Sequence, residues 1–248
     1  MQLVSTALLL AYAVSSPVQA SSAYPEWVMS SFRMRHAVTG AEYAGKIGAY
    51  ASDPDPQDEL EFSLVSGPAW LTVALDGTLR GTPAAADRGT QTFTVAATEP
   101  GGLTRTATMS FDVFLPAEES VSTLKVLTYN LWHGLGTING GHRKGIEGIL
   151  LSDADLVRTQ ETVDNVSGSG VYQAAQIASE LGWFYSPTGA GDSGIISRYP
   201  IVEEFTAGIA NGVRAQLAGS GTGGTGQQAI LYNCHLDYLY YGPYRAHQ

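Results

Sequence analysis

Cysteine is almost absent from this chain of 248 residues, because only Cys234 is present. A single cysteine cannot form an intrachain disulfide, so the fold must be held together by hydrophobic cores, which a chain of this length can build. Cys234 ends an apolar run that begins at Ala229. This pattern predicts a small buried strand residue rather than a reactive thiol.

Positive charge is also scarce, with 13 lysines and arginines against 23 aspartates and glutamates. Residues 21–120 hold 6 basic and 13 acidic side chains, and residues 121–248 hold 7 and 10. Neither half has the basic stripe that sequence-independent nucleic-acid binding uses. The balance argues against a nuclease without excluding one, because bound divalent cations invert the local charge.

Long apolar runs are missing after the first twenty residues. Residues 6–14 read TALLLAYAV, and a Ser-Ser-Pro break and the triplet Val18-Gln19-Ala20 follow them. An apolar run of this length before a small-x-small triplet is typical of a signal peptide, although the basic start is missing here. No later run reaches the roughly 20 apolar residues of a membrane span. We therefore predict a signal peptide at residues 1–20 and a secreted, extracellular protein without a transmembrane span.

Residues 23–116 have the texture of an all-β sandwich. Polar and apolar residues alternate at 61–65, 91–96 and 104–114, and turn residues such as Ser66-Gly67-Pro68 and Pro100-Gly101-Gly102 separate these segments. Short alternating segments without a helical period predict two packed sheets. Trp70 is expected to fill the space between them.

The order of several short motifs resembles the dystroglycan-type cadherin-like (Ig-like) domains of exported proteins. The motifs lie at residues 52–55, 60–64, 67–71, 76–79, 81–83 and 97–103. The resemblance implies an Ig/cadherin-like sandwich that binds an extracellular or cell-wall ligand. It also favours a Ca²⁺ site at Asp53, Asp55 and Asp58, because carboxylate oxygens suit this ion. The alternative is a solvated acidic turn, in which Asp and Pro occur for backbone reasons.

The texture changes after a polar linker at residues 117–123. Residues 124–129, 155–157, 194–196 and 229–234 predict strands, and residues 141–151 and 172–181 have apolar residues at helical spacing. Alternating strands and helices predict an α/β domain over residues 124–248. The chain is thus expected to be multidomain.

Polar residues follow three of these strands, and a strand holds such residues rigidly at the edge of a sheet. The segments are 126–132, 154–161 and 231–238, with Ile195–Ile201 between the second and the third. In this order they resemble the endonuclease/exonuclease/phosphatase superfamily, whose members include deoxyribonucleases and sphingomyelinases. The resemblance implies that Asn130 helps to hold phosphate and metal, that Glu161 binds Mg²⁺ (or Mn²⁺), and that His235 contacts the scissile phosphate or assists the leaving group.

The chemistry of these residue types agrees with the resemblance, because Mg²⁺ takes few protein ligands and favours carboxylate and amide oxygens. Taken singly, each residue has an ordinary structural alternative. Asn130 fits a strand-terminating cap, Glu161 a surface carboxylate and His235 a strand histidine with satisfied hydrogen bonds.

Members of the superfamily are α/β (α+β) sandwiches of a four-layer type built from two similar halves, and this chain matches only the first half. The second half brings the general base that activates water, so we expect a fragment of a longer protein with little or no activity of its own. Two hypotheses follow from the sequence. The first is a secreted metal-dependent phosphoesterase-like protein acting on nucleic acid, sphingolipid or inositol phosphate. The alternative is a non-enzymatic, calcium-binding, cadherin-like adhesion or binding protein.

Overall fold

The computed structural model describes residues 23–116, 121, 123–164, 166, 170–187, 192–207, 210–217 and 226–235. The predicted signal peptide and most of the predicted linker lie outside these residues. Among the helices of the described part, none is both long and apolar enough to cross a membrane.

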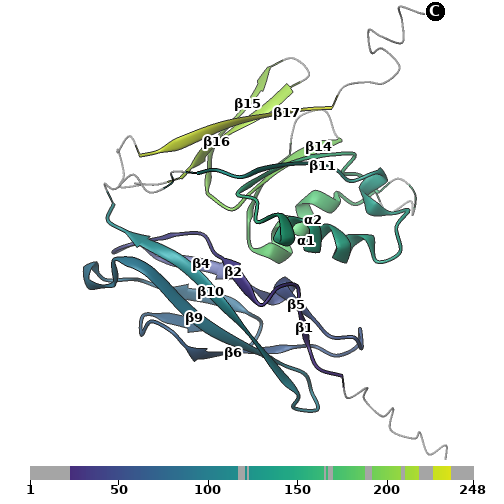
Figure 1. Cartoon of the computed structure of the whole chain (residues 1–248). Helices are drawn as coiled ribbons and strands as arrows, with labels where there is room; N and C mark the ends of the chain where they lie inside the picture. The colour runs from purple at the N-terminus through teal and green to yellow at the C-terminus, as the bar shows by residue number, and fades with distance from the viewer. Residues whose placement is uncertain are drawn as a thin grey trace, which may run out of the picture.

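Residues 26–114 form three sheets of short strands (Figure 1). The largest sheet has the order β2-β10-β9-β6, with β3 also paired to β10; a second has the order β4-β8-β7, and β1 pairs with β5. The prediction of an all-β sandwich is confirmed. The elements are β1 (Glu26–Trp27), β2 (Ser31–Arg33), β3 (Ala37–Val38), β4 (Tyr43–Lys46), η1 (Gly48–Tyr50), β5 (Ala51–Ser52), β6 (Glu61–Ser66), β7 (Leu71–Val73), β8 (Thr78–Gly81), η2 (Ala85–Asp87), β9 (Gly89–Thr98) and β10 (Thr104–Phe114).

Strand β10 shows how the sequence specifies this sandwich. Ala107, Met109 and Phe111 are buried, and the residues between them are more exposed. Successive side chains of a strand point to opposite faces, so this alternation turns one face of the sheet toward the core. Trp70 is partly buried against the core, and its ring centroid lies 5.4 Å from that of Phe111.

Residues 126–234 form two further sheets and two α-helices. The first sheet has the order β11-β12-β14-β13, in which β12 is parallel to β11 and antiparallel to β14; the second is the antiparallel β15-β16-β17. The elements are β11 (Val126–Asn130), η3 (His133–Leu135), α1 (Gly141–Ser152), β12 (Leu156–Gln160), α2 (Gln173–Leu181), β13 (Phe184–Pro187), β14 (Ser193–Ser197), β15 (Ile201–Ala207), β16 (Ala210–Gln216) and β17 (Gln228–Cys234).

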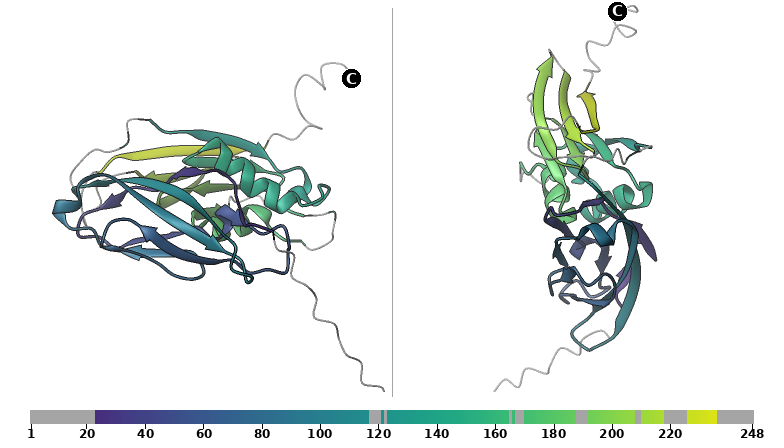
Figure 2. Two further views of the ribbon diagram at one scale, coloured as in Figure 1. Left: turned by 60° about the horizontal axis from the view of Figure 1, so that its bottom comes forward. Right: turned by 90° about the vertical axis from the view of Figure 1, so that its left-hand side faces the viewer.

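The parts of the molecule stack in one direction (Figures 1 and 2). The helices α1 and α2 lie between the N-terminal sandwich and the four-stranded sheet, and β15-β16-β17 covers the opposite face of that sheet. Strand β12 is therefore covered on both sides, and Leu156, Val157 and Thr159 are fully buried. Strand β12 departs from the continuous apolar run expected for a strand buried on both faces, because its buried Thr159 and Gln160 are polar and are satisfied by hydrogen bonds to Gly194 and Asn233.

The N-terminal sandwich and the helices share one hydrophobic core. Ile47 and Tyr50, from η1 and the residue before it, belong to the same buried cluster as Ile177 and Leu181 of α2. Gly182 ends α2 with a φ of +66°, and a Cβ atom there would lie 2.6 Å from Cβ of Lys46. The close approach of the two parts thus depends on a glycine at this position.

An ionic cluster also joins the two parts. Asp155 is fully buried, and it accepts hydrogen bonds from Nη2 of Arg33 (2.8 Å) and from the backbone N–H of Lys125 (2.9 Å). Asp153 accepts bonds from Nε of Arg33 (3.2 Å) and from Nη2 of Arg198 (3.1 Å). Buried charges are costly unless they are paired, so these contacts hold the N-terminal strand β2 against the C-terminal part.

Cys234 lies at the end of the predicted strand, but its side chain is exposed. The neighbouring Asn233 is buried instead, and it donates hydrogen bonds to the backbone oxygens of Thr159 (2.9 Å) and Gly194 (3.0 Å). Because side chains alternate along a strand, Cys234 then faces outward. The prediction of a buried cysteine was therefore wrong.

The C-terminal part is richer in strands than the sequence pattern indicated. Both α-helices form where they were predicted, whereas β13, β15 and β16 have no counterpart among the predicted strands. Two helices do not establish the four-layer sandwich of a phosphoesterase, so that architecture stays a prediction.

Candidate functional sites

Three strands end close together on one side of the C-terminal part. Asn130 is the last residue of β11, Glu161 follows β12, and His235 follows β17. Asn130 pairs in register with Gln160, so the parallel strands β11 and β12 end at the same edge. His235 comes from the other sheet, whose β17 packs against β12. The structure thus brings together three residues that are far apart in the sequence.

Glu161 is the centre of this group. Its Oε1 accepts a hydrogen bond from Nδ2 of Asn130 (2.8 Å), and Nε2 of His235 lies 3.8 Å from the same oxygen. Its Oε2 accepts the backbone N–H of His133 at 3.2 Å, and its carbonyl oxygen accepts that of Gly134 at 2.7 Å. Both carboxylate oxygens are held by the one segment that follows β11, through Asn130 and His133, which fixes their orientation.

The hydrogen bonds around Glu161 favour its ionised form. The bond from Asn130 is the main cause that lowers the pKa of Glu161, and the amide of His133 and the nearby imidazole of His235 lower it further against the effect of partial burial. A carboxylate that stays charged suits a cation or a proton-donating ligand.

The loop after β11 has an unusual backbone. Trp132, His133, Gly134 and Leu135 all have positive φ, at 40°, 53°, 59° and 63°. Residues other than glycine and a few polar ones pay a cost in this region, so it persists where the surroundings impose it. Here Oδ1 of Asn130 accepts the backbone N–H of Trp132 at 2.8 Å, and Glu161 accepts those of His133 and Gly134.

Two polar residues that sequence reasoning did not single out support the site from below. Nε2 of Gln160 donates to Oδ1 of Asn233 at 2.7 Å, and both side chains are buried. Asn233 also bonds the backbone of β12 and β14, so it ties the second sheet to the first directly below His235. A polar Asn inside the apolar run of β17 was the available signal.

Arg158, in strand β12, connects two of the strands that end at the site. Its Nη2 donates to Oγ1 of Thr128 at 2.6 Å, and its Nη1 donates to the carbonyl oxygen of Tyr232 at 3.2 Å. The guanidinium therefore bridges β11 and β17, two strands that end in site residues.

The group around Glu161 has features of a cation site and also lacks some. One ionised carboxylate offers lone pairs beyond its two hydrogen bonds, which fits Mg²⁺ because this ion keeps several waters and takes few protein ligands. Within the described ranges, however, no three His, Cys, Asp or Glu side chains come close enough to form a metal cage. Any cation here would depend mainly on Glu161, water and a phosphate ligand.

The acidic residues proposed for calcium line a cavity of about 680 Å³ between the N-terminal sandwich and the helices, which Lys46 and Arg143 line as well. Oδ1 of Asp53 accepts the N–H of Asp55 (2.9 Å), and Oδ1 of Asp55 accepts that of Gln57 (3.1 Å). The remaining oxygens of Asp53 and Asp58, both Oδ2, are buried without a hydrogen-bond partner in the described part. Reduced contact with water and then the charges of Asp55, Asp53 and Glu99 raise the pKa of Asp58.

The acidic residues have features of both predicted arrangements, the turn and the Ca²⁺ site. Asp53 and Asp55 do form turns, as the alternative interpretation requires. Their free oxygens and the raised pKa of Asp58 indicate repulsion that a cation would relieve. In the described ranges they do not form a ready set of three ligands.

Comparison with known proteins agrees with the fold of the N-terminal part. Residues 35–114 match the family model of the putative Ig domain. The chain is 28% identical over 127 residues to the uncharacterized protein F14F9.5 of Caenorhabditis elegans, a match that covers 50% of this chain and 37% of that protein. The chain therefore spans well under half of the length of this relative.

Solved structures with some likeness include both enzymes and cadherins. An endo-fucoidan hydrolase of glycoside hydrolase family 107 is 28% identical, with 38% of this chain and 16% of that chain covered and a TM-score of 0.32. The third cadherin domain of human protocadherin 7 is 14% identical, with 43% and 99% covered and a TM-score of 0.31. Together, the strand topology and the family model show that the N-terminal part of this chain is an Ig-like domain.

Proposed function

We propose that this chain is an extracellular binding protein whose Ig-like domain binds its ligand in a calcium-dependent way, and that its C-terminal part carries a metal-dependent phosphoester site. The binding role has the broader support, because a family model matches most of the N-terminal domain. The phosphoester role rests on one observation, which is the contact of Asn130, Glu161 and His235.

Calcium is the expected effector of the Ig-like domain. The observation that supports it is the pair of buried, unpartnered carboxylate oxygens of Asp53 and Asp58 in one cavity. A bound Ca²⁺ would neutralise these carboxylates and fix the loop that carries them. Calcium therefore should raise the melting temperature of the chain, by the general rule that a ligand of the folded state stabilises it.

The test of calcium binding is thermal unfolding of the full chain with and without millimolar Ca²⁺. Asp58→Asn and Asp53→Asn should each remove most of the shift in Tm. Glu42→Gln is the matched control, because Glu42 is an exposed acid of the same domain that pairs with Arg80. No shift in the wild type, or an equal shift in all variants, would contradict the proposal.

Export is the second part of this proposal. The apolar segment at residues 6–14 and the triplet ending at Ala20 support it. Mass spectrometry of the protein from the culture medium of an expressing cell should find a mature N-terminus near Ser21. A protein that stays inside the cell and keeps Met1 would speak against export.

The phosphoester site would use the chain's own groups in distinct roles. Glu161 would hold Mg²⁺ or Mn²⁺ with help from Asn130, and when bound the ion supplies charge neutralisation at the phosphoryl oxygens. His235 stands next to the carboxylate, where a ring N–H can donate a hydrogen bond to a phosphate oxygen. The amide of Asn130 keeps the carboxylate ionised and oriented.

Calorimetric titration of the full chain with Mg²⁺ tests this second function. Glu161→Gln keeps the shape of the side chain but removes its charge, and it should abolish binding. Asn130→Ala should weaken binding by about tenfold, since groups that orient a metal ligand contribute on this scale. Glu147→Gln, which changes a partly exposed carboxylate of α1 paired with Arg143, is the control that should bind like the wild type. Equal binding by Glu161→Gln would rule out the site.

A further inference from the structure

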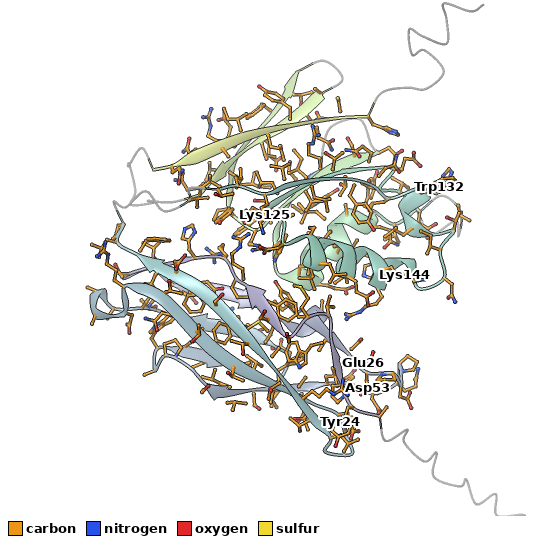
Figure 3. The ribbon with its side chains drawn as sticks, in the orientation of Figure 1. Tyr24, Glu26, Asp53, Lys125, Trp132 and Lys144 are labelled. Atoms are coloured by element: carbon orange, nitrogen blue, oxygen red, sulfur yellow. The ribbon has the colours of Figure 1, made fainter. Side chains whose placement is uncertain are left out.

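Trp132 is a large aromatic side chain that the fold leaves in solvent beside the Glu161 site. Its side chain is 64% exposed, although tryptophan is usually among the more buried residues. It follows Asn130 by two residues and projects at the end of the C-terminal part where β11 ends (Figure 3). The segment that carries Trp132 thus bonds the Glu161 carboxylate through the backbone of His133, while the indole itself fills no core.

The chain holds Trp132 in this position by specific contacts. Oδ1 of Asn130 accepts its backbone N–H, and its own carbonyl oxygen accepts the N–H of Leu135 at 3.2 Å. The φ of Trp132 is +40°, a value that is costly for a bulky residue. Neither hydrophobic burial nor a relaxed backbone explains an exposed tryptophan here.

His133, the residue next to Trp132, links the indole to the Glu161 carboxylate. The indole makes an edge contact with the imidazole of His133, with centroids 6.5 Å apart. The backbone of His133 donates to Oε2 of Glu161, so one short segment presents both an aromatic face and the support of the carboxylate. Behind it, a Cβ atom on Gly134 would lie 2.5 Å from the backbone nitrogen of Asp164, which shows that the segment is wedged in place.

We propose that Trp132 is a specificity-determining residue that stacks on a planar ring in the organic part of the phosphoester bound at Glu161. This inference rests on the proposed phosphoester function and adds the substrate class, which is small phosphate esters with an aromatic or base-like ring. Rings stack on exposed indoles because every such ring has a π-face, and each stacked ring contributes about tenfold to affinity. The acidic balance of the chain favours small esters over long polyanions.

Fluorine NMR of the full chain labelled with 5-fluorotryptophan tests this role. The chain has four tryptophans, so the spectrum is simple, and Trp132→Phe identifies the signal of Trp132. Phenyl phosphate and methyl phosphate are titrated in the presence of Mg²⁺. Phenyl phosphate should shift the Trp132 signal and bind about tenfold more tightly than methyl phosphate.

Three variants complete the test. Trp132→Ala should lose the preference and bind both esters like methyl phosphate, whereas Trp132→Phe should keep part of it. Trp27→Phe changes a tryptophan of the Ig-like domain and should leave the preference intact. Alanine and phenylalanine meet the same backbone cost at this φ, and circular dichroism confirms that the variants fold.

The outcomes separate the two proposals. Equal binding of both esters by the wild type, or an unchanged preference in Trp132→Ala, would overturn the role of Trp132 alone. Failure of both esters to bind, together with unchanged Mg²⁺ binding in Glu161→Gln, would overturn the phosphoester site itself and this inference with it.

Discussion

The two parts of this chain use their acidic residues in different ways. In the Ig-like domain, carboxylates bond the backbone of their own turns, as Asp76 does with Thr78 and Glu99 with Gly101 and Leu103. In the C-terminal part, the Glu161 carboxylate is bonded by Asn130 and His133, which lie about 30 positions earlier in the chain, and Asp155 is bonded by an arginine of the other domain. The first arrangement shapes loops, whereas the second joins distant elements.

This difference teaches where function is to be sought in a chain with few other signals. A carboxylate that caps its own turn has an adequate structural reason to be there. The Glu161 carboxylate accepts hydrogen bonds from residues outside its own turn, has a lowered pKa and keeps free lone pairs. Such a carboxylate is suited to bind a ligand or to link distant elements. Asp53 and Asp58 lie between the two cases, because each leaves one oxygen without a partner in the described part.

The largest effect on stability should follow from removing Asp155 from the ionic cluster that joins the two parts. Asp155→Ala deletes a fully buried carboxylate and leaves Arg33 and the buried Arg198 without this partner. We expect a loss of about 3 kcal/mol in the free energy of unfolding, because Arg33, Arg198 and the backbone N–H of Lys125 lose a buried acceptor, while Asp153 still pairs with both arginines. Urea unfolding followed by tryptophan fluorescence measures it. A change below about 1 kcal/mol would show that the joint does not hold the two parts together.

A smaller loss should follow from changing the loop that carries Trp132. In Gly134→Ala, the new Cβ would lie 2.5 Å from the backbone nitrogen of Asp164, at a φ of +59°. The segment must shift, which should cost about 1–3 kcal/mol and displace the amides that hold Glu161. Gly140→Ala is the control, because its φ is +64° but no atom lies within 4 Å of the new Cβ. If thermal unfolding shows the same loss of stability for both variants, the close contact of Gly134 with Asp164 does not hold the loop in place.

The stability of the chain should depend on pH through His36, which lies between the two parts. Burial, followed by the charge of Arg35, lowers the pKa of His36 to about 4 from an ordinary 6.5, against the charges of Asp112 and Asp155. Between pH 6.5 and 4, His36 is therefore protonated in the unfolded chain but mostly neutral in the folded chain. The stability contributed by neutral His36 is complete above pH 6.5 and is lost as the pH falls to about 4.

We expect this loss to be about 1–3 kcal/mol across the window. His36→Phe should flatten it, because phenylalanine keeps the ring contacts with Phe114 and Tyr199 and cannot take up a proton. Urea midpoints at pH 7 and pH 4.5 are the measurement. An unchanged slope in His36→Phe would assign the pH dependence to other groups.

The smallest effect is expected for an exposed ion pair of the Ig-like domain. Glu42 and Arg80 are 64% and 63% exposed, and their atoms lie 2.9 Å apart. Solvent screens such a pair, so Glu42→Gln should change the free energy of unfolding by less than about 0.5 kcal/mol. A loss comparable to that of Asp155→Ala would show that burial does not separate the two ion pairs in their effect on stability.

The sequence predicted local structure well where its periodicity was strong. The alternation at residues 104–114 matches β10, and the apolar spacing at 141–151 matches α1. Strands β15 and β16 contain charged, small and Asn-Gly residues, so their pattern is weak, and only the pairing between them and with β17 makes them strands. The buried Asn233 shows the same limit, since its partners come from β12 and β14.

The residues of the candidate site were predictable because each follows a strand. Their mutual contact was an implication of the resemblance, and the structure places Glu161 against both Asn130 and His235. The joint between the parts had no signal in the sequence, because Arg33 and Asp155 are 122 positions apart. The exposure of Trp132 was also beyond sequence reasoning, since a tryptophan after an apolar strand is usually buried.

The central claim is that Asn130, Glu161 and His235 form one cation-dependent site. The most direct test is paramagnetic broadening by Mn²⁺ in the ¹H–¹⁵N spectrum of the full chain, because broadening reports the place of the ion. The amides of His133 and Gly134, which bond Glu161, should broaden first, and Glu161→Gln should abolish this effect. Sharp signals for both amides at saturating Mn²⁺, or the same broadening in Glu161→Gln, would contradict the claim.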